Sequence, residues 1–329
     1  YPVIRRNGPC GIGRDFAAGP WHHSAMTQHA DRPVLGIVLM LGFCTVIPFA
    51  DALAKLLGAD FPLFQLILVR FATQAILFVP VAVWARQALF PSRRVVGLTL
   101  VRTLLQMAGL LLMFSALRLL PLADAVAIAF VMPFIMLLLG WAFLQEEVGP
   151  RRLIACAVGF LGTLMVVQPS FAAVGWGALL PLGVAVVFAL FMLVTRTMAK
   201  GIDPMALQGA SGLMAIPLLV PLAFLPVAET APLVGWVAAG GSQIWLFVGL
   251  GIFGSIGHLL MTWSLRYAPS ATLAPMQYLE IPIAALVGLA IFGEFPNGLA
   301  LAGICVTIAA GLYIVMRERA VSRAAPPTA

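Results

Sequence analysis

The sequence predicts an all-α integral membrane protein with ten transmembrane helices, arranged as two inverted five-helix repeats around a central cavity. Of its 329 residues, 62% are hydrophobic and only 9% are charged, whereas a soluble domain carries roughly 25% charged residues. Apolar runs recur along the whole chain, and motifs of the first half return in the second half in the same order. Lipid is therefore the expected solvent for most of the surface.

Ten apolar runs are long enough to cross a bilayer, which takes about 20 residues per helix. Charged residues and Gly/Pro clusters delimit them. The expected spans are residues 34–57, 62–84, 95–118, 121–144, 151–168, 175–198, 204–227, 243–266, 269–293 and 297–317. Four spans begin at or near a proline, whose missing N–H is harmless in a first turn. These prolines are Pro62, Pro121, Pro204 and Pro269.

The basic residues between the spans predict the orientation. With the N-terminus in the cytoplasm, the outer connections hold one basic residue, Arg118. The cytoplasmic connections hold Arg32, Arg86, Arg93, Arg94, Arg151, Arg152, Arg196, Lys200, Arg266, Arg317, Arg319 and Arg323. Positive loops face the cytoplasm, so we expect a multi-pass protein of the cytoplasmic (inner) membrane with both termini in the cytoplasm.

The two ends of the chain lack the apolar pattern. We expect an N-terminal tail over residues 1–33, of which 1–25 are disordered or not native, and a cytoplasmic tail over 318–329. The net charge of +7 does not indicate nucleic-acid binding, because the basic residues punctuate the apolar runs. The four cysteines have no metal-like spacing, so neither a metal nor a cofactor is expected.

An internal repeat links the two halves, residues 34–168 and 175–317. The stretch "LRLLPLADA" at 117–125 resembles "LRYAPSATL" at 265–273, an offset of 148 that also relates Glu146 to Glu294. Five spans per half is an odd number, so the second half enters the membrane upside down. Inverted repeats are typical of secondary transporters, whose substrate site lies near the midplane between the halves.

Two long segments carry a family resemblance. These are "FSALRLLPLADAVAIAFVMPFIMLLLGWAFLQEEVGPRR" and "WSLRYAPSATLAPMQYLEIPIAALVGLAIFGEF". Each contains a helix, a short turn, a proline-broken helix and a terminal Glu, and each resembles the EamA-type domain of the drug/metabolite transporter superfamily. The resemblance implies ten helices around a central cavity, alternating access without ATP, and transport of small metabolites, often outward.

Ionisable groups inside spans are costly and should face a cavity or a partner. The candidate substrate or coupling residues are Asp51, Arg70, Gln106, Asp124, His258, Gln277, Tyr278 and Glu280, and the candidate hinges are Pro48, Pro133 and Pro282. Glu280 falls almost at the centre of its span. It either ties helices together through hydrogen bonds, or it lines the cavity and binds a cationic group or carries a coupling proton.

Other polar residues leave alternatives open. Asp51 and Lys55 are spaced i,i+4, as in a local ion pair, but Asp51 also suits a gate or a substrate contact. Arg70 suits a structural ion pair and a substrate anion site equally well. Arg102 is expected to snorkel to the cytoplasmic face, whereas Gln106 lies deeper and suits the cavity.

Two further candidates have simple structural interpretations. Asp124 sits in a first turn, where the helix dipole favours an acid. His258 shares a polar face with Ser255 and Thr262, which indicates either hydrogen bonding between helices or a cavity wall.

The predicted function is secondary active transport of a small metabolite or drug. Export is the expected direction and proton coupling is left open. The alternatives are a membrane enzyme acting on a lipid-linked substrate and a non-transporting scaffold or channel. The chain has neither a P-loop nor an HExxH motif, so we expect no enzyme. The expected partners are a small molecule and the lipid bilayer, with no nucleic acid, and a homodimer is left open.

Overall fold

The structure of the chain, a computed structural model, describes residues 32–132, 149–167, 175–225 and 233–293. It also describes residues 135, 139, 141–143, 298–299, 301–303, 305–306, 308–310, 313 and 316. The predicted hinge Pro133, the repeat marker Glu146 and most of both predicted tails lie outside these residues.

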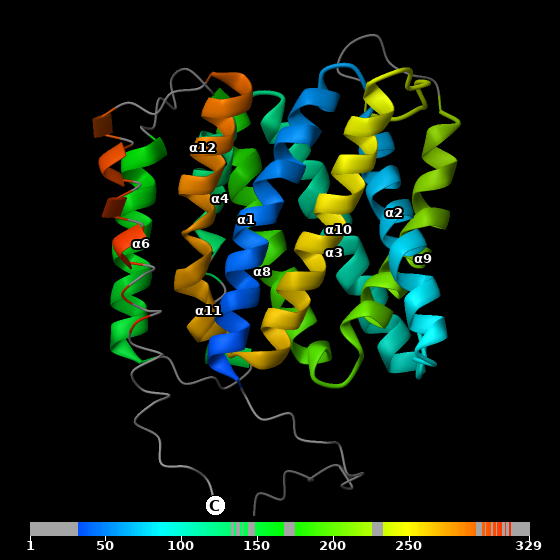
Figure 1. Ribbon diagram of the computed structural model, residues 1–329, viewed down its shortest axis with the longest axis horizontal. Coiled ribbons are helices and arrows are strands. Elements are labelled where there is room, and N and C mark those ends of the chain that lie inside the picture. Colours follow the sequence, from blue (N-terminus) through cyan, green and yellow to red (C-terminus); the bar gives the residue numbers. More distant parts are fainter. Residues whose placement is uncertain are drawn as a thin grey trace, which may run out of the picture.

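Long helices stand side by side and make up almost all of the described part (Figure 1). They are α1 (Pro33–Gly58), α2 (Leu63–Trp84), α3 (Arg93–Leu117), α4 (Leu122–Ala129), α6 (Pro150–Val167), the short 3₁₀ helix η1 (Gly175–Ala178), α8 (Leu179–Ala199), α9 (Pro204–Ala223), α10 (Gln243–Tyr267), α11 (Ser270–Gln277) and α12 (Glu280–Phe292). Among the described residues, six helices are long and apolar enough to cross a membrane: α1, α2, α3, α8, α9 and α10. This confirms the all-α membrane fold, and the ten-span prediction is consistent with it.

The helix starts follow from local chemistry. Pro62, Pro121 and Pro269 each precede the first residue of a helix, and Pro204 is itself the first residue of α9. Asp203 caps α9, because its Oδ1 accepts hydrogen bonds from the Met205 and Ala206 amides at 2.9 and 3.1 Å. Such caps satisfy amides that have no partner inside the helix.

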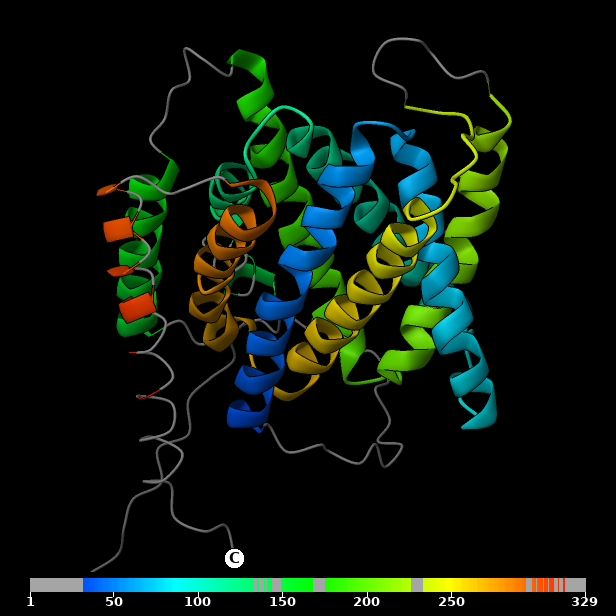
Figure 2. The same cartoon turned by 45° about the horizontal axis from the view of Figure 1, so that its top comes forward.

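The core forms where helices of the first half pack on helices of the second half. The main pairs are α1 with α10, α2 with α9, and α3 with α8; α1 and α10 lie next to each other in both views (Figures 1 and 2). A Cβ at Gly212 of α9 would lie 2.8 Å from the Ala75 amide nitrogen and 2.9 Å from the Phe71 carbonyl oxygen of α2. Small residues thus let these backbones approach closely, as is typical inside membranes.

The sequence repeat is visible in two short helices. Residues Leu122–Ala129 form α4 and Ser270–Gln277 form α11, so both helices have eight residues and the offset is again 148. Each is followed by a two-residue turn, at 130–131 and at 278–279. The predicted span 269–293 is therefore broken into α11 and α12. Pro282 lies in the first turn of α12, where its missing N–H removes no helical hydrogen bond.

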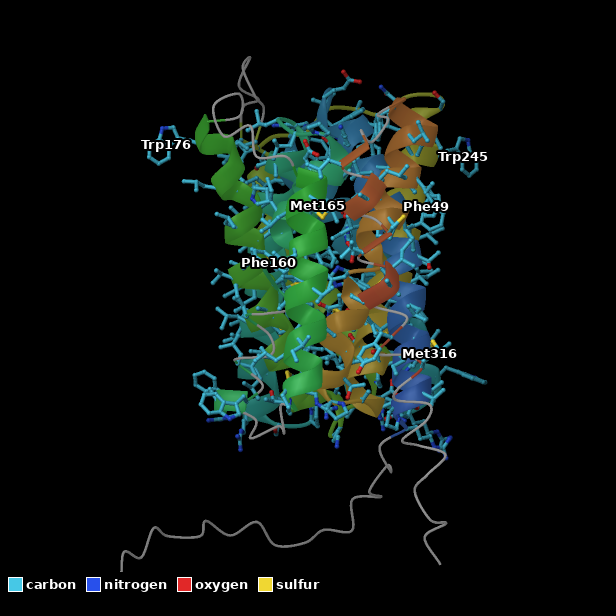
Figure 3. All side chains as sticks on the ribbon, turned by 90° about the vertical axis from the view of Figure 1, so that its left-hand side faces the viewer. Phe49, Phe160, Met165, Trp176, Trp245 and Met316 are labelled. Atoms are coloured by element: carbon cyan, nitrogen blue, oxygen red, sulfur yellow. The ribbon has the colours of Figure 1, made fainter. Side chains whose placement is uncertain are left out.

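The two ends of the bundle differ in their side chains. Trp176 and Trp245 are 87% and 75% exposed, and both project outward near the same end (Figure 3). At the other end, called the basic end here, α1 begins after Arg32, whose amide donates to the Tyr267 carbonyl at 2.9 Å, and α10 ends next to Arg266. Lys55 and Arg118 lie at the opposite ends of α1 and α3. Tryptophans at the membrane interface and basic residues on the cytoplasmic side would produce this pattern. The orientation itself stays a prediction.

Candidate functional site

A cavity lies between the two halves of the bundle. Its walls come from α1, α2, α3 and α4 of the first half and from α8, α10 and α12 of the second half. The lining residues are Phe43, Ile47, Asp51, Arg70, Gly109, Leu110, Met113, Val126, Ala129, Phe130, Met132, Val184, Phe188, His258 and Glu280. Small-molecule sites typically have mostly apolar walls with a few well-placed polar groups, and this cavity has that composition.

Four of the predicted site residues meet in this cavity: Asp51, Arg70, His258 and Glu280. They come from four helices, and each is at most 7% exposed. The charge of Arg70 acts on Asp51, and the charge of Asp51 acts on Glu280. The cavity therefore offers groups of both signs within an apolar wall.

Glu280 owes its position to the broken helix. It is the first residue of α12, because the turn at 278–279 separates α12 from α11. The amides of a first helical turn have no partner inside the helix and carry partial positive charge, which favours a carboxylate there. Many transporters also use the ends of broken helices at a central cavity to present backbone groups to a substrate.

Arg70 lies in the middle of α2 and is only 1% exposed. Its Nε, Nη1 and Nη2 atoms have no hydrogen-bond partner among the described residues. The guanidinium packs against α10, because a Cβ at Gly254 would come within 2.6 Å of both Cζ and Nε. The side chain is thus held in place by packing while its donors remain unused.

His258 forms the aromatic and amide side of the cavity. Its Nδ1 lies 3.3 Å from Nε2 of Gln106. The rings of Phe43, Phe188 and Phe191 lie edge-on to the imidazole, with centroid distances of 6.4, 5.7 and 5.6 Å. The predicted polar face of α10 therefore points into the bundle, and Gln106 reaches the cavity through His258.

The prediction that Arg102 snorkels to the cytoplasmic face is wrong. Arg102 is 0% exposed, and it donates hydrogen bonds to Thr195 at 3.0 Å, to Ser211 at 2.7 Å and to Thr262 at 3.4 Å. Its guanidinium also lies over the Phe191 ring, 4.7 Å from the centroid. Hydroxyl groups of α8, α9 and α10 solvate this charge inside the protein, so it has no need to reach water.

Lys55 and Asp51 of α1 each have a further neighbour besides each other. The Lys55 ammonium lies over the Phe292 ring, 4.7 Å from the centroid, and the charge of Arg70 acts on Asp51. Asp51 lies in the cavity wall, and its local pairing with Lys55 stays a prediction.

The remaining predicted residues lie outside the cavity lining. Gln277 is buried, with Nε2 3.4 Å from the sulfur of Met192, and the buried ring of Tyr278 packs on Phe130 at a centroid distance of 5.7 Å. Asp124 is half-buried in the first turn of α4. Helix α1 runs unbroken through Pro48. The substrate and hinge roles of these residues stay predictions.

Two groups of residues in and around the site were not predicted. One is the set of aromatic walls, Phe43, Phe130 and Phe188, which a hydropathy pattern cannot distinguish from lipid-facing phenylalanines. The other is the set of polar partners around Arg102, such as Thr195 and Ser211. An isolated hydroxyl in an apolar span is the only signal the sequence offers for them. Within the described part of the chain, no cluster of His, Cys, Asp or Glu could hold a metal ion.

Residues 34–168 and 175–317 each match the EamA-like transporter family. The chain is 28% identical to a riboflavin transporter of Rhizobium johnstonii, over 67% of this chain and 70% of that protein. It is 26% identical to an S-adenosylmethionine uptake transporter of Rickettsia felis, covering 82% and 88% of the two chains. It is also 26% identical to a pseudopaline exporter of Pseudomonas aeruginosa, covering 88% and 96%.

A solved crystal structure has the same fold, with a TM-score of 0.66 at 19% identity, over 85% of this chain and 97% of that chain. The relatives are named as transporters, in agreement with the prediction that the chain is not an enzyme. The family match covers both halves of the helical bundle and confirms the resemblance drawn from the repeat motifs. The chain therefore belongs to the EamA-like transporter family and is a multi-pass membrane protein.

Proposed function

We propose that the chain moves a small organic metabolite across the cytoplasmic membrane by alternating access, with the central cavity as its substrate site. The observation that carries this proposal is the position of the cavity between the two halves, with Asp51, Arg70, His258 and Glu280 in its wall. Burying charged side chains inside a membrane protein costs free energy, and such residues usually face a substrate pathway or pair with another group.

The substrates named for relatives agree with this kind of site. Riboflavin and S-adenosylmethionine each carry a flat heteroaromatic ring system, and Phe43, Phe130 and Phe188 provide aromatic walls for one. Stacked and edge-on ring contacts stabilise such pairs by about 0.5–1.5 kcal/mol each. A ring-bearing metabolite with charged or polar substituents is therefore the proposed substrate.

Alternating access requires that the seam between the halves opens on one side at a time. The cavity lies beside the half of α3 that ends at Leu117, and Arg102 ties α3 to α8, α9 and α10 about two turns away, toward the basic end. Opening toward the basic end would have to break these bonds. The turns at 130–131 and 278–279 provide places where α4 and α12 can move without breaking helical hydrogen bonds.

The test is a solute profile in vesicles. Purified protein is placed in liposomes with a small-molecule cell extract on one side and an imposed pH gradient, and moved solutes are identified by mass spectrometry. We expect wild-type protein to move at least one solute that protein-free liposomes do not. The relatives are named for both uptake and export, so both orientations of the gradient are measured; export is the predicted direction.

Glu280→Gln tests the role of the cavity carboxylate. It keeps the size of the side chain and removes its charge and exchangeable proton, so we expect folded protein without active transport. If binding persists while the response to the pH gradient disappears, Glu280 carries a proton; if binding fails, it contacts the substrate. Asp60→Asn is the control, because this exposed carboxylate lies in the turn after α1, outside the cavity lining. Wild-type rates in Glu280→Gln would reject the cavity as the substrate site.

A further inference from the structure

We propose that Arg70 forms an anion subsite of the cavity and that the transported metabolite carries an acidic group, a carboxylate or a phosphate. This inference rests on the transport function proposed above and specifies the chemistry of its substrate. It starts from a buried cation whose hydrogen-bonding capacity the described part of the protein leaves unused.

The guanidinium of Arg70 is expensive in its present surroundings. Arginine carries five N–H donors, cannot be deprotonated in a protein, and is normally satisfied when buried. Here the side chain is 1% exposed, and none of its three nitrogens has a hydrogen-bond partner in the described residues. An unsatisfied buried charged group costs several kcal/mol. A ligand with acceptor oxygens would remove that cost when it binds.

The geometry of the side chain is fixed before a ligand arrives. Gly254 of α10 lies against the guanidinium, and a Cβ at that position would be 2.6 Å from Cζ. The guanidinium is thus packed against α10, and Arg70 also lines the cavity. A rigid, planar fork matches the paired oxygens of a carboxylate or phosphate, which it binds with two parallel hydrogen bonds.

A structural ion pair with Asp51 is the simpler alternative. The two charges do act on each other, but Arg70 donates no hydrogen bond to Asp51 or to any other described residue. Coulomb attraction from Asp51 lowers the cost of burying the guanidinium and leaves its donors free. With Glu280 also in the wall, a substrate that carries both an acidic group and a positive group would find a partner for each.

The experiment uses pairs of compounds that differ in one acidic group. The pairs are S-adenosylmethionine and its decarboxylated form, tryptophan and tryptamine, and flavin mononucleotide and riboflavin; the first two test a carboxylate and the third a phosphate. Binding to the full-length purified protein is measured by calorimetry. In at least one pair we expect the acid-bearing member to bind the wild type roughly 30-fold more tightly, the effect of one buried charged partner. Arg70→Gln should abolish that preference.

Two further variants keep the test decisive. If Arg70→Gln does not fold, Arg70→Lys takes its place. It retains the positive charge but loses the planar pair of donors, so it should keep only part of the preference for the acid-bearing compound. Arg70→Gln with Asp51→Asn removes both charges; full recovery of binding in this double variant would show that Arg70 only neutralises Asp51 and would overturn the inference. The inference also fails if no acid-bearing compound binds the wild type more tightly than its partner, or if the preference survives in Arg70→Gln.

Failure of the transport proposal would look different. Wild-type liposomes would then move no solute from the extract. Failure of the anion subsite alone would leave transport intact and insensitive to substitution of Arg70.

Discussion

Arg70 and Arg102 lie in neighbouring helices of the same half, and both are almost completely buried, yet their surroundings are opposite. The guanidinium of Arg102 donates three hydrogen bonds to hydroxyl groups from α8, α9 and α10 and lies on a phenylalanine ring. The guanidinium of Arg70 has no hydrogen-bond partner among the described residues and borders a cavity. The two arginines contribute equally to a hydropathy profile. In the structure, however, one belongs to a hydrogen-bonded cluster and the other lines a cavity.

The difference separates a structural site from a binding site. The Arg102 cluster extends further, because Nε2 of Gln208 donates to Thr262 at 2.9 Å and Nε2 of Gln74 donates to the Gln208 carbonyl at 2.7 Å. Four helices beyond α3 are thereby connected through one polar network. Arg70 makes no hydrogen bond to a described residue, so hydrogen bonding there does not offset the cost of burying its charge. Residues kept at a cost to stability are typical of functional sites.

The largest effect should appear when each arginine is replaced by leucine. Arg102→Leu removes three charge-assisted hydrogen bonds, each contributing about 1.5–3 kcal/mol, and only part of this is offset by relief from burying the charge. We expect the free energy of unfolding to fall by about 2 kcal/mol or more. Arg70→Leu removes an unsatisfied charge, so the free energy of unfolding should stay the same or rise. Thermal unfolding of both variants in the same detergent measures whether each substitution lowers or raises the stability.

The comparison also has an internal control. Arg102→Lys keeps a cation but cannot reach three hydroxyls with a planar fork, so its melting temperature should lie between those of Arg102→Leu and the wild type. A lower melting temperature for Arg70→Leu than for Arg102→Leu would contradict the assignment of a structural role to Arg102.

The sequence predicted the helices well because hydropathy is summed over about 20 residues. The first span was expected at 34–57 and is observed at Pro33–Gly58, and the eighth was expected at 243–266 and is observed at Gln243–Tyr267. The offset of 148 reappears as α4 and α11. Four candidate residues could also be predicted from the sequence, because ionisable residues inside a membrane span are costly and usually face a cavity or a partner. These four residues line one cavity.

The partners of each charge could not be predicted in the same way. Arg102 was expected to reach water because its nearest sequence neighbours are apolar, but its three hydroxyl partners lie 93 to 160 residues away. The contact between Arg70 and Gly254 likewise joins residues that are far apart in the sequence, so the sequence does not reveal it. Composition shows that a charge must be compensated, whereas only the packing of helices from both halves shows what compensates it.

A smaller effect should follow from displacing Arg70 without removing it. In Gly254→Ala the new methyl group would meet the guanidinium at 2.6 Å, and overpacking of this kind costs about 1–3 kcal/mol. We expect binding of the acid-bearing compound to weaken by roughly tenfold. Gly249→Ala is the matched control on the same helix, since its methyl group would meet only the flexible end of Leu53. Equal losses in both variants would indicate a general effect on α10.

The smallest effect is expected at Gln106, on the helix that carries Arg102. Its Nε2 lies 3.3 Å from Nδ1 of His258, a long contact, while its buried Oε1 has no partner in the described residues. Gln106→Met has a similar volume and removes both features: the lost hydrogen bond costs about 0.5–1.5 kcal/mol, and relief of the unsatisfied carbonyl oxygen returns a similar amount. The two terms nearly cancel, so the melting temperature should change little.

A change in stability as large as that of Arg102→Leu would show that Gln106 belongs to the structural network after all. If the melting temperature is unchanged but binding is weakened, Gln106 serves the cavity through His258, and the boundary between the two regions runs between Arg102 and Gln106, one turn apart on α3.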